Sequence, residues 1–137
     1  MNAMRKDRAI KSPAKEYAQS QKGNAMVEFA LILPVFLTLV LGMMYYSIAL
    51  YNKIVLTMAV REGARAGAIS ASTSNATDAA NDFNDKLISL GSPSTPTFTP
   101  AINSGTKIVT VTATYNYPEF YVFPAISLSA ETTMRLE

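Results

Sequence analysis

The sequence contains no cysteine and no histidine in its 137 residues. These absences exclude disulfides, thiol nucleophiles, Cys/His zinc sites and a Ser-His-Asp triad. Charged residues are also scarce, at 16% of the chain, and the mean hydropathy of +0.14 is high for a protein of this size. The carboxylates in the second half form no recognisable catalytic pair, and no phosphate-binding loop is present. We therefore expect no metal, no cofactor and no enzymatic activity.

The few charges are unevenly distributed along the chain. Residues 1–23 carry six Lys/Arg side chains against Asp7 and Glu16, whereas residues 24–137 carry a net charge of −2. A basic tail can bind nucleic acid, but this one lacks interleaved aromatic residues and leads directly into an apolar run. It is typical of the cytoplasmic flank of a membrane segment, and we expect no nucleic-acid partner.

The apolar run extends from Ala25 to Tyr51, and no residue from Phe29 to Asn52 is charged. About 20 apolar residues in a helix suffice to cross a bilayer. A core helix of a soluble protein would show one polar face, and this run shows none. The sequence therefore predicts a transmembrane helix over about residues 27–51.

The flanking charges predict the orientation of this span. Six basic residues precede it, whereas Lys53, Arg61 and Arg65 follow within a comparable distance. The excess favours a single pass through the bacterial cytoplasmic membrane, with the N-terminus inside and the C-terminus outside. Three tyrosines cluster at the far end, where an interfacial aromatic belt is expected: Tyr45, Tyr46 and Tyr51.

The run is too long for the apolar part of a secretory signal peptide, and no A-x-A site closes it. A plain single-pass anchor with a small periplasmic binding domain is one interpretation. Two residues set this sequence apart from a plain anchor. Gly23 directly follows Lys22, and Glu28 places a carboxylate at the start of the apolar helix, which costs up to about 3 kcal/mol in lipid.

The string from Lys22 to Phe29 resembles the class III signal of type IV prepilins and pseudopilins. This resemblance implies that a membrane-bound prepilin peptidase cuts between Gly23 and Asn24 on the cytoplasmic side. Glu28 then becomes the fifth residue of the mature protein, which is the usual position of this acid in the family.

Two longer strings narrow the resemblance to the TadE-like family of pilus-assembly proteins. They are Gly23–Leu31 followed by Leu33-Pro34, and Ala59–Ala66, which is close to the family's A-R-E-G-A-R string. The resemblance implies a structural or assembly subunit of a Tad-type (Flp, type IV-like) pilus, an appendage of cell adhesion. The implied partners are the peptidase, other pilin-like subunits in homo- or hetero-oligomers, an inner-membrane platform with its ATPase, and membrane lipid. A type II secretion pseudopilin is the alternative within the same class.

The spacing of Asn24 and Glu28 has a physical rationale. Cleavage creates a positive amine at Asn24, and residues four apart lie on one helix face. This amine can pair with the chain's own Glu28 or with the Glu28 of a neighbour, and the second pairing would set the axial register between subunits. The alternative is that Glu28 simply lies among the lipid headgroups.

The helix should continue past the membrane to about Ser70. A stripe of small residues with a spacing of four, suited to close helix approach, comprises Ala59, Gly63, Gly67 and Ala71. Arg61 and Arg65 lie one turn apart on a neighbouring face, where they are either solvated or candidate subunit contacts.

Beyond the helix, SASTSNAT indicates a break, and Asn75 or Thr77 should cap a short helix over 78–90. Its predicted apolar face comprises Ala79, Ala80, Phe83, Leu87 and Leu90. Alternation of apolar and polar residues predicts strands over 107–115 and 126–136, with an edge strand near 97–102. The aromatic segment 117–124 is either a loop packed on the sheet or a surface patch.

These elements predict an α+β fold with three parts. Residues 1–23 form a basic leader, and residues 24–70 form a long, partly transmembrane N-terminal helix. Residues 71–137 form a small extracytoplasmic domain with a short helix and an antiparallel sheet of about three strands laid against the outer half of the long helix.

Overall fold

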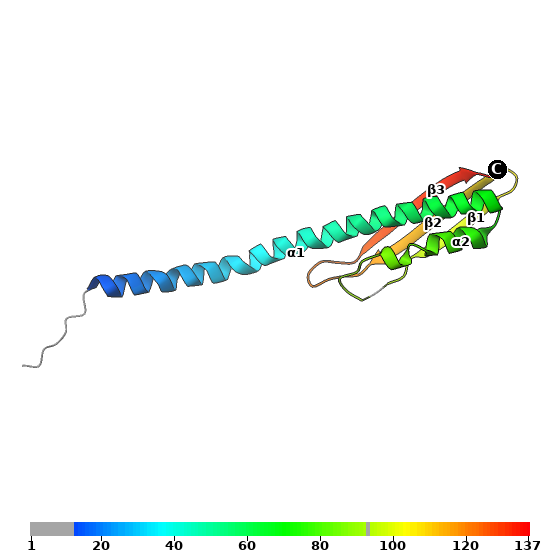
Figure 1. Cartoon of the computed structure of the whole chain (residues 1–137). Helices are drawn as coiled ribbons and strands as arrows, with labels where there is room; N and C mark the ends of the chain where they lie inside the picture. Colours follow the sequence, from blue (N-terminus) through cyan, green and yellow to red (C-terminus); the bar gives the residue numbers. More distant parts are fainter. Residues whose placement is uncertain (1–12, 93) are drawn as a thin grey trace, which may run out of the picture. The chain divides into compact units, whose positions relative to one another are not determined.

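The computed structural model describes residues 13–92 and 94–137, with side chains from Gly23 onward. The helices are α1 (Pro13–Ser70), α2 (Thr73–Asn81) and the short 3-10 helix η1 (Asn84–Lys86) (Figure 1). The strands are β1 (Thr97–Asn103), β2 (Ile108–Tyr117) and β3 (Ile126–Arg135). The α+β prediction of one long helix, one short helix and a three-stranded antiparallel sheet is confirmed. The chain divides into two units at Val40, and Leu41–Glu137 contains the folded domain.

Helix α1 runs through 58 residues and includes Pro34. Proline removes one backbone hydrogen bond, but a helix of good helix-forming residues continues past it when neighbouring groups compensate. The helix ends as expected at Ser70, and Ala71 adopts a left-handed conformation with φ of 48°. The backbone N–H of Glu137 donates to the carbonyl of Ala68 at 3.4 Å and so satisfies one terminal carbonyl of α1.

The sheet has the order β1-β2-β3, with antiparallel pairing throughout. In its register, Val111 of β2 lies between Pro100 of β1 and Thr132 of β3. Pro100 is accommodated because β1 is an edge strand, where a missing N–H need not break the ladder. Side chains alternate between a polar outer face and an apolar inner face, as the sequence pattern indicates.

The inner face of the sheet packs on the outer part of α1. The predicted apolar face of β2 is buried, and Tyr117 extends it: Val109, Val111, Ala113, Tyr115 and Tyr117. The opposing core residues of α1 include Leu56, Val60 and Ala64. Helix α2 lies beside α1 on the same face of the sheet, because a Cβ added at Gly63 would approach both Ala80 of α2 and Val111 of β2.

The predicted position of the short helix is wrong by about five residues. Helix α2 begins at Thr73, and its N-cap is Ser72, whose hydroxyl accepts from the N–H of Asn75. Neither Asn75 nor Thr77 is the cap. The small polar residues that indicate a break instead form the helix, because Ala76 and Ala80 are buried against α1.

The end of α2 also differs from the prediction. The helix stops at Asn81, so only Ala79 and Ala80 of the predicted apolar face belong to it, and Ala80 is buried. The other three members of that face lie outside α2: Phe83 and Leu87 flank η1, and Leu90 follows it.

The aromatic segment after β2 forms the β2–β3 loop. Phe120 and Phe123 exchange two backbone hydrogen bonds, of 3.0 and 2.9 Å, across a turn made by Tyr121 and Val122. The two phenylalanines pack against the core, whereas Tyr121 and Val122 are exposed. Both interpretations of the segment therefore apply, each to different side chains.

Candidate functional site

The predicted cleavage site lies in regular helix. Gly23 and Asn24 are exposed within α1, and a Cβ added at Gly23 would meet nothing within 4 Å. A glycine inside a helix costs about 1 kcal/mol relative to alanine, so the helix is locally weakened at this peptide bond. The cleavage itself stays a prediction.

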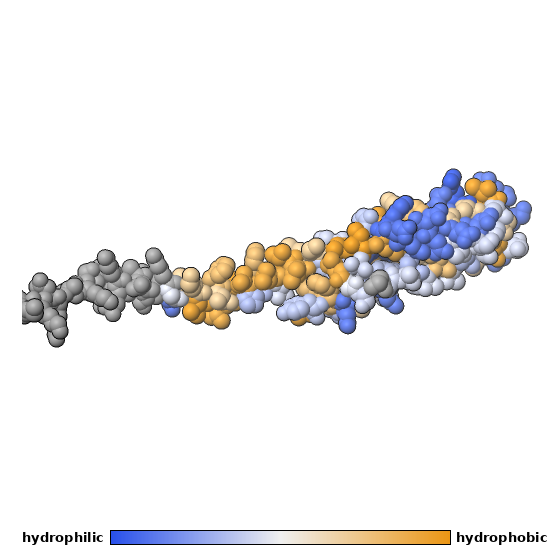
Figure 2. Space-filling view, turned by 60° about the horizontal axis from the view of Figure 1, so that its bottom comes forward, coloured by the Kyte–Doolittle hydropathy of each residue, from blue (hydrophilic) through white to orange (hydrophobic). Residues whose placement is uncertain are grey.

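Glu28 lies one turn beyond Asn24 on α1, and every residue from Gly23 to Val40 is exposed. α1 contains a stretch that is long and apolar enough to cross a membrane. Apolar side chains also dominate the visible surface of this stretch in Figure 2. Such a surface requires lipid or protein around it.

The small-residue stripe packs within the chain. At Gly63, an added Cβ would lie 2.8 Å from the carbonyl oxygen of Ala76, and at Gly67 it would lie 3.0 Å from the Ala76 Cβ. Ala59 is buried as well. The close approach that these residues permit is therefore between α1 and α2. Ala71, the predicted last member of the stripe, lies beyond the end of α1.

The opposite side of the same helix segment is exposed and largely apolar. Leu50, Ile54 and Met58 are 66%, 55% and 52% exposed, at a spacing of four residues. Ile69 and the predicted contact residues Arg61 and Arg65 continue this line. We call these six residues the outer apolar face. The guanidinium of Arg65 pairs with the Glu62 carboxylate at 3.1 Å.

Two residues of α1 have anchoring roles that the sequence analysis does not predict. Asn52 is fully buried on α1; its Nδ2 donates to the Ile88 carbonyl at 2.6 Å, and its Oδ1 accepts from the Ile88 N–H at 3.0 Å. This pair of bonds holds the segment after η1 against α1. The sequence signal for this role is a single amide side chain, Asn52, at the end of the charge-free run.

Tyr45 is the second anchor, and its predicted place in an interfacial belt is wrong. It is fully buried, and its hydroxyl lies 2.7 Å from the Pro124 carbonyl oxygen and 3.1 Å from that of Pro118. The β2–β3 loop covers it. Tyr46 and Tyr51 remain exposed, as a belt requires.

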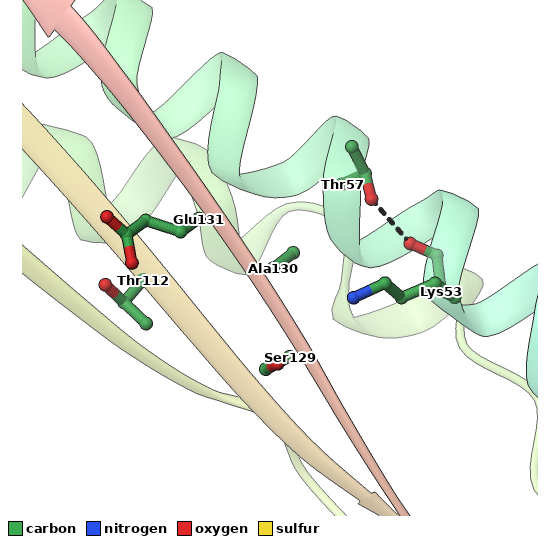
Figure 3. Close-up of a pocket in the computed structure, with 6 residues that line it drawn as sticks. All are labelled: Lys53, Thr57, Thr112, Ser129, Ala130 and Glu131. Carbon is green, nitrogen blue, oxygen red and sulfur yellow. Dashed lines mark hydrogen bonds between the residues drawn. The ribbon is translucent and has the colours of Figure 1, made fainter.

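A hollow of about 320 Å³ is lined by residues of α1, of the central strand β2 and of the edge strand β3. Its lining consists of Lys53, Thr57, Thr112, Ser129, Ala130 and Glu131 (Figure 3). The Thr57 hydroxyl donates to the Lys53 carbonyl at 2.8 Å, so it is already engaged in the helix. One cation, one carboxylate and three hydroxyls suit polar contacts with another molecule rather than catalysis by a carboxylate pair.

The part of the chain with described side chains contains no cluster of three or more His, Cys, Asp or Glu residues able to hold a metal. What the described geometry offers is surface: an exposed apolar helix, a carboxylate one turn from a predicted new N-terminus, and the outer apolar face.

A comparison with protein families agrees with these features. The family model described as "TadE-like protein" matches residues 23–65, from the predicted cleavage site to Arg65. No curated protein and no solved structure matches the chain. The resemblance seen in the sequence is thereby confirmed: residues 23–65 are similar to TadE-like proteins, and this similarity supports an association with the Tad pilus.

Proposed function

We propose that this protein is a pilin-like structural or assembly subunit of a Tad-type pilus, without enzymatic activity. In this proposal, the prepilin peptidase removes the leader after Gly23. The mature helix then stays in the inner membrane, with the domain outside, until it packs with the helices of other subunits. The assembly platform and its ATPase supply the work of extraction.

The observation that carries the proposal is the length of the exposed apolar surface on α1. A bilayer core of about 30 Å covers about 20 helical residues. A span that starts at Asn24 ends near Met44, and one that starts at Glu28 ends near Ile48. Ile54, Met58 and Ile69 of the outer apolar face are exposed beyond either limit.

A plain membrane anchor gives these side chains no partner. Exposed apolar surface of this kind marks a protein–protein contact, and a bundle of α1 helices supplies one. Arg61 and Arg65 interrupt the apolar line, and charged groups beside such a contact favour correct partners and register. We therefore assign both arginines to the subunit contact.

Glu28 supplies the second element of the proposal. It is exposed in the single chain and lies four residues from Asn24, so one helix face holds both the carboxylate and the amine created by cleavage. Inside a helix bundle, pairing with the amine of a neighbour removes the cost of two unpaired charges. The pair then fixes the axial position of one subunit against the next.

Two measurements on cells with the native peptidase test the proposal. N-terminal sequencing should give Asn24 as the first residue, and Gly23→Ala should slow the cleavage. Glu28→Gln protein should be inserted and cleaved but should be lost from pili, or should fail to support them, because breaking a buried pair costs roughly 3–5 kcal/mol. Asp78→Asn, at an exposed position on α2, is the matched control. Intact Met1 protein alone, together with normal pili from Glu28→Gln, would favour the plain anchor.

A further inference from the structure

We infer that the tip of the β2–β3 loop, Tyr121 and Val122, inserts into the outer leaflet of the bilayer that α1 spans. The domain would thus hold the membrane at two points before assembly. This inference rests on the proposed transmembrane placement of α1.

The tip is the most exposed apolar feature of the domain. Tyr121 is 83% exposed, more than any other large hydrophobic side chain in the described part of the chain, and Val122 is 61% exposed. The residues on either side of this pair, Phe120 and Phe123, pack inward against the core. The loop therefore directs one pair of apolar side chains into the core and presents the other pair to its surroundings.

The backbone at the tip is strained. Tyr121 has a φ of 56° at the first position of a two-residue turn. Turns of this kind favour Gly, Asn or Asp there, because a left-handed conformation is unfavourable for other residues. An exposed aromatic residue at this position serves neither the turn nor the core. Strain of this kind points to a role outside the fold.

The loop that carries the tip packs against one short segment of α1, Gly42–Tyr45. The ring of Phe123 stacks on Tyr45 at 5.3 Å, and a Cβ added at Gly42 would lie 3.1 Å from the Phe123 ring. The Tyr45 hydroxyl bonds to the Pro124 carbonyl on the far side of the turn. The loop thus lies against Gly42–Tyr45, where Met43, Met44 and Tyr46 are also exposed.

This segment corresponds to the outer part of the membrane. In the sequence, Gly42 comes 20 residues after Lys22, the last basic residue of the leader, and 14 residues after Glu28. At about 1.5 Å per residue of a spanning helix, these counts correspond to about 30 Å and about 21 Å of helix length. Gly42 therefore falls within the outer third of a hydrocarbon core about 30 Å thick. The next charged residue along α1 is Lys53.

The chemistry of the loop favours a shallow position. Tyrosine is enriched where one side of the ring is apolar and the hydroxyl is hydrated. The charged group of the loop, Glu119, is exposed two residues before Tyr121. Its carboxylate needs water, so the loop is expected at the headgroup boundary, with Tyr121 and Val122 directed toward the acyl chains.

Because the sequence has no tryptophan, a single introduced tryptophan reports on one position. We propose Tyr121→Trp, Thr106→Trp and Phe36→Trp in the full chain, reconstituted in phosphatidylcholine/phosphatidylglycerol vesicles with lipids brominated at a shallow or a deep acyl position. Thr106 is exposed in the β1–β2 turn. This turn lies near the C-terminal end of α1, because the carbonyl of Lys107 accepts from the Leu136 N–H, and the N–H of the next residue, Glu137, donates to the Ala68 carbonyl. Phe36 is in the proposed span.

The Tyr121→Trp emission should lie at shorter wavelength than that of Thr106→Trp and should lose intensity most with the shallow bromolipid. Phe36→Trp should lose intensity most with the deep one. Quenching of Phe36→Trp with none of Tyr121→Trp would overturn the inference and leave the span intact. A blue shift of Tyr121→Trp without quenching would assign the tip to a protein contact and likewise overturn it. Failure to quench Phe36→Trp would overturn the proposed span itself.

Discussion

The two halves of α1 differ in how much of their surface is buried. From Gly23 to Val40 every residue is exposed and most are large and apolar, such as Phe29, Leu31 and Phe36. From Leu41 to Ser70 one face is buried under the sheet and α2, and that face is rich in alanine and glycine. One continuous helix thus changes its partner along its length.

Within the second half, residue size distinguishes the face that packs against the chain's own domain from the face that is left exposed. Small residues on the outer half let the chain's own α2 and sheet approach closely, as at Gly63 and Gly67. The exposed outer apolar face carries larger side chains, including Leu50, Ile54 and Met58. The stripe that resembles a subunit interface therefore serves the fold, and the candidate interface lies on the other side.

The largest expected effect comes from a glycine of the buried face. Gly63→Leu should destabilise the domain by about 3 kcal/mol or more, because its Cβ alone would lie 2.8 Å from a backbone carbonyl. Thermal unfolding followed by circular dichroism in detergent measures this loss. Gly23→Leu is the matched control on the exposed half and should leave the domain unchanged. Equal unfolding temperatures for the two variants would contradict the distinction between the halves.

Asn52→Ala should follow, with a loss of about 2–3 kcal/mol, because it leaves both the N–H and the carbonyl of Ile88 without their partner. Faster hydrogen exchange should appear first at residues 86–90. Ser47→Ala removes a hydroxyl bond to the Met43 carbonyl on the exposed side and should have little effect. Unchanged exchange at residues 86–90 would rule out the anchoring role of Asn52.

A smaller effect should separate two buried phenols whose rings lie 4.9 Å apart. Tyr45→Phe should cost about 1 kcal/mol, since its hydroxyl binds loop carbonyls, whereas Tyr117→Phe should be neutral or stabilising. Within the described residues, the buried Tyr117 hydroxyl makes no hydrogen bond of normal geometry, although the Leu90 backbone lies close enough to lower its pKa slightly. Urea unfolding of both variants measures the difference, and equal losses would contradict it.

Tyr117 also predicts that the stability of the domain depends on pH. Burial, with smaller contributions from Tyr45 and Tyr115, raises the pKa of the Tyr117 phenol above its usual 10.0. The folded state therefore holds this proton more tightly than the unfolded state, and its contribution to stability is lost as the pH rises through the raised pKa. Tyr117→Phe should reduce the loss of stability above pH 10. An identical alkaline profile in the two proteins would exclude Tyr117 as its source.

The regular parts of this fold could be predicted from the sequence because their patterns are strong. The charge-free run after Glu28 predicts a long helix, and alternation predicts the strands that contain Val109–Tyr115 and Ile126–Met134. The start of α2 could not be predicted in this way. Its first residues, Thr73, Ser74 and Asn75, have weak helix preference, and the helix is stabilised where Ala76 and Ala80 pack against Gly63 and Gly67 of α1.

The residues of the candidate site also divide into those that the sequence can predict and those that it cannot. Gly23, Asn24 and Glu28 carry a local pattern that can be recognised without a structure. The roles of Tyr45 and Asn52 depend on partners more than 30 residues away, Pro124 and Ile88, and no local pattern encodes such pairs. The outer apolar face becomes visible only after the sheet has covered the other side of α1.

The most direct test of the account is whether the outer apolar face is needed in the pilus. Met58→Glu places a charge on an exposed position and should leave folding, insertion and cleavage intact. Thr99→Glu, at an exposed position on β1, is the control. The amount of pili sheared from cells, and of this protein within them, should fall strongly for Met58→Glu and stay normal for Thr99→Glu. Normal pili from a folded and cleaved Met58→Glu protein would contradict assembly through this face of α1.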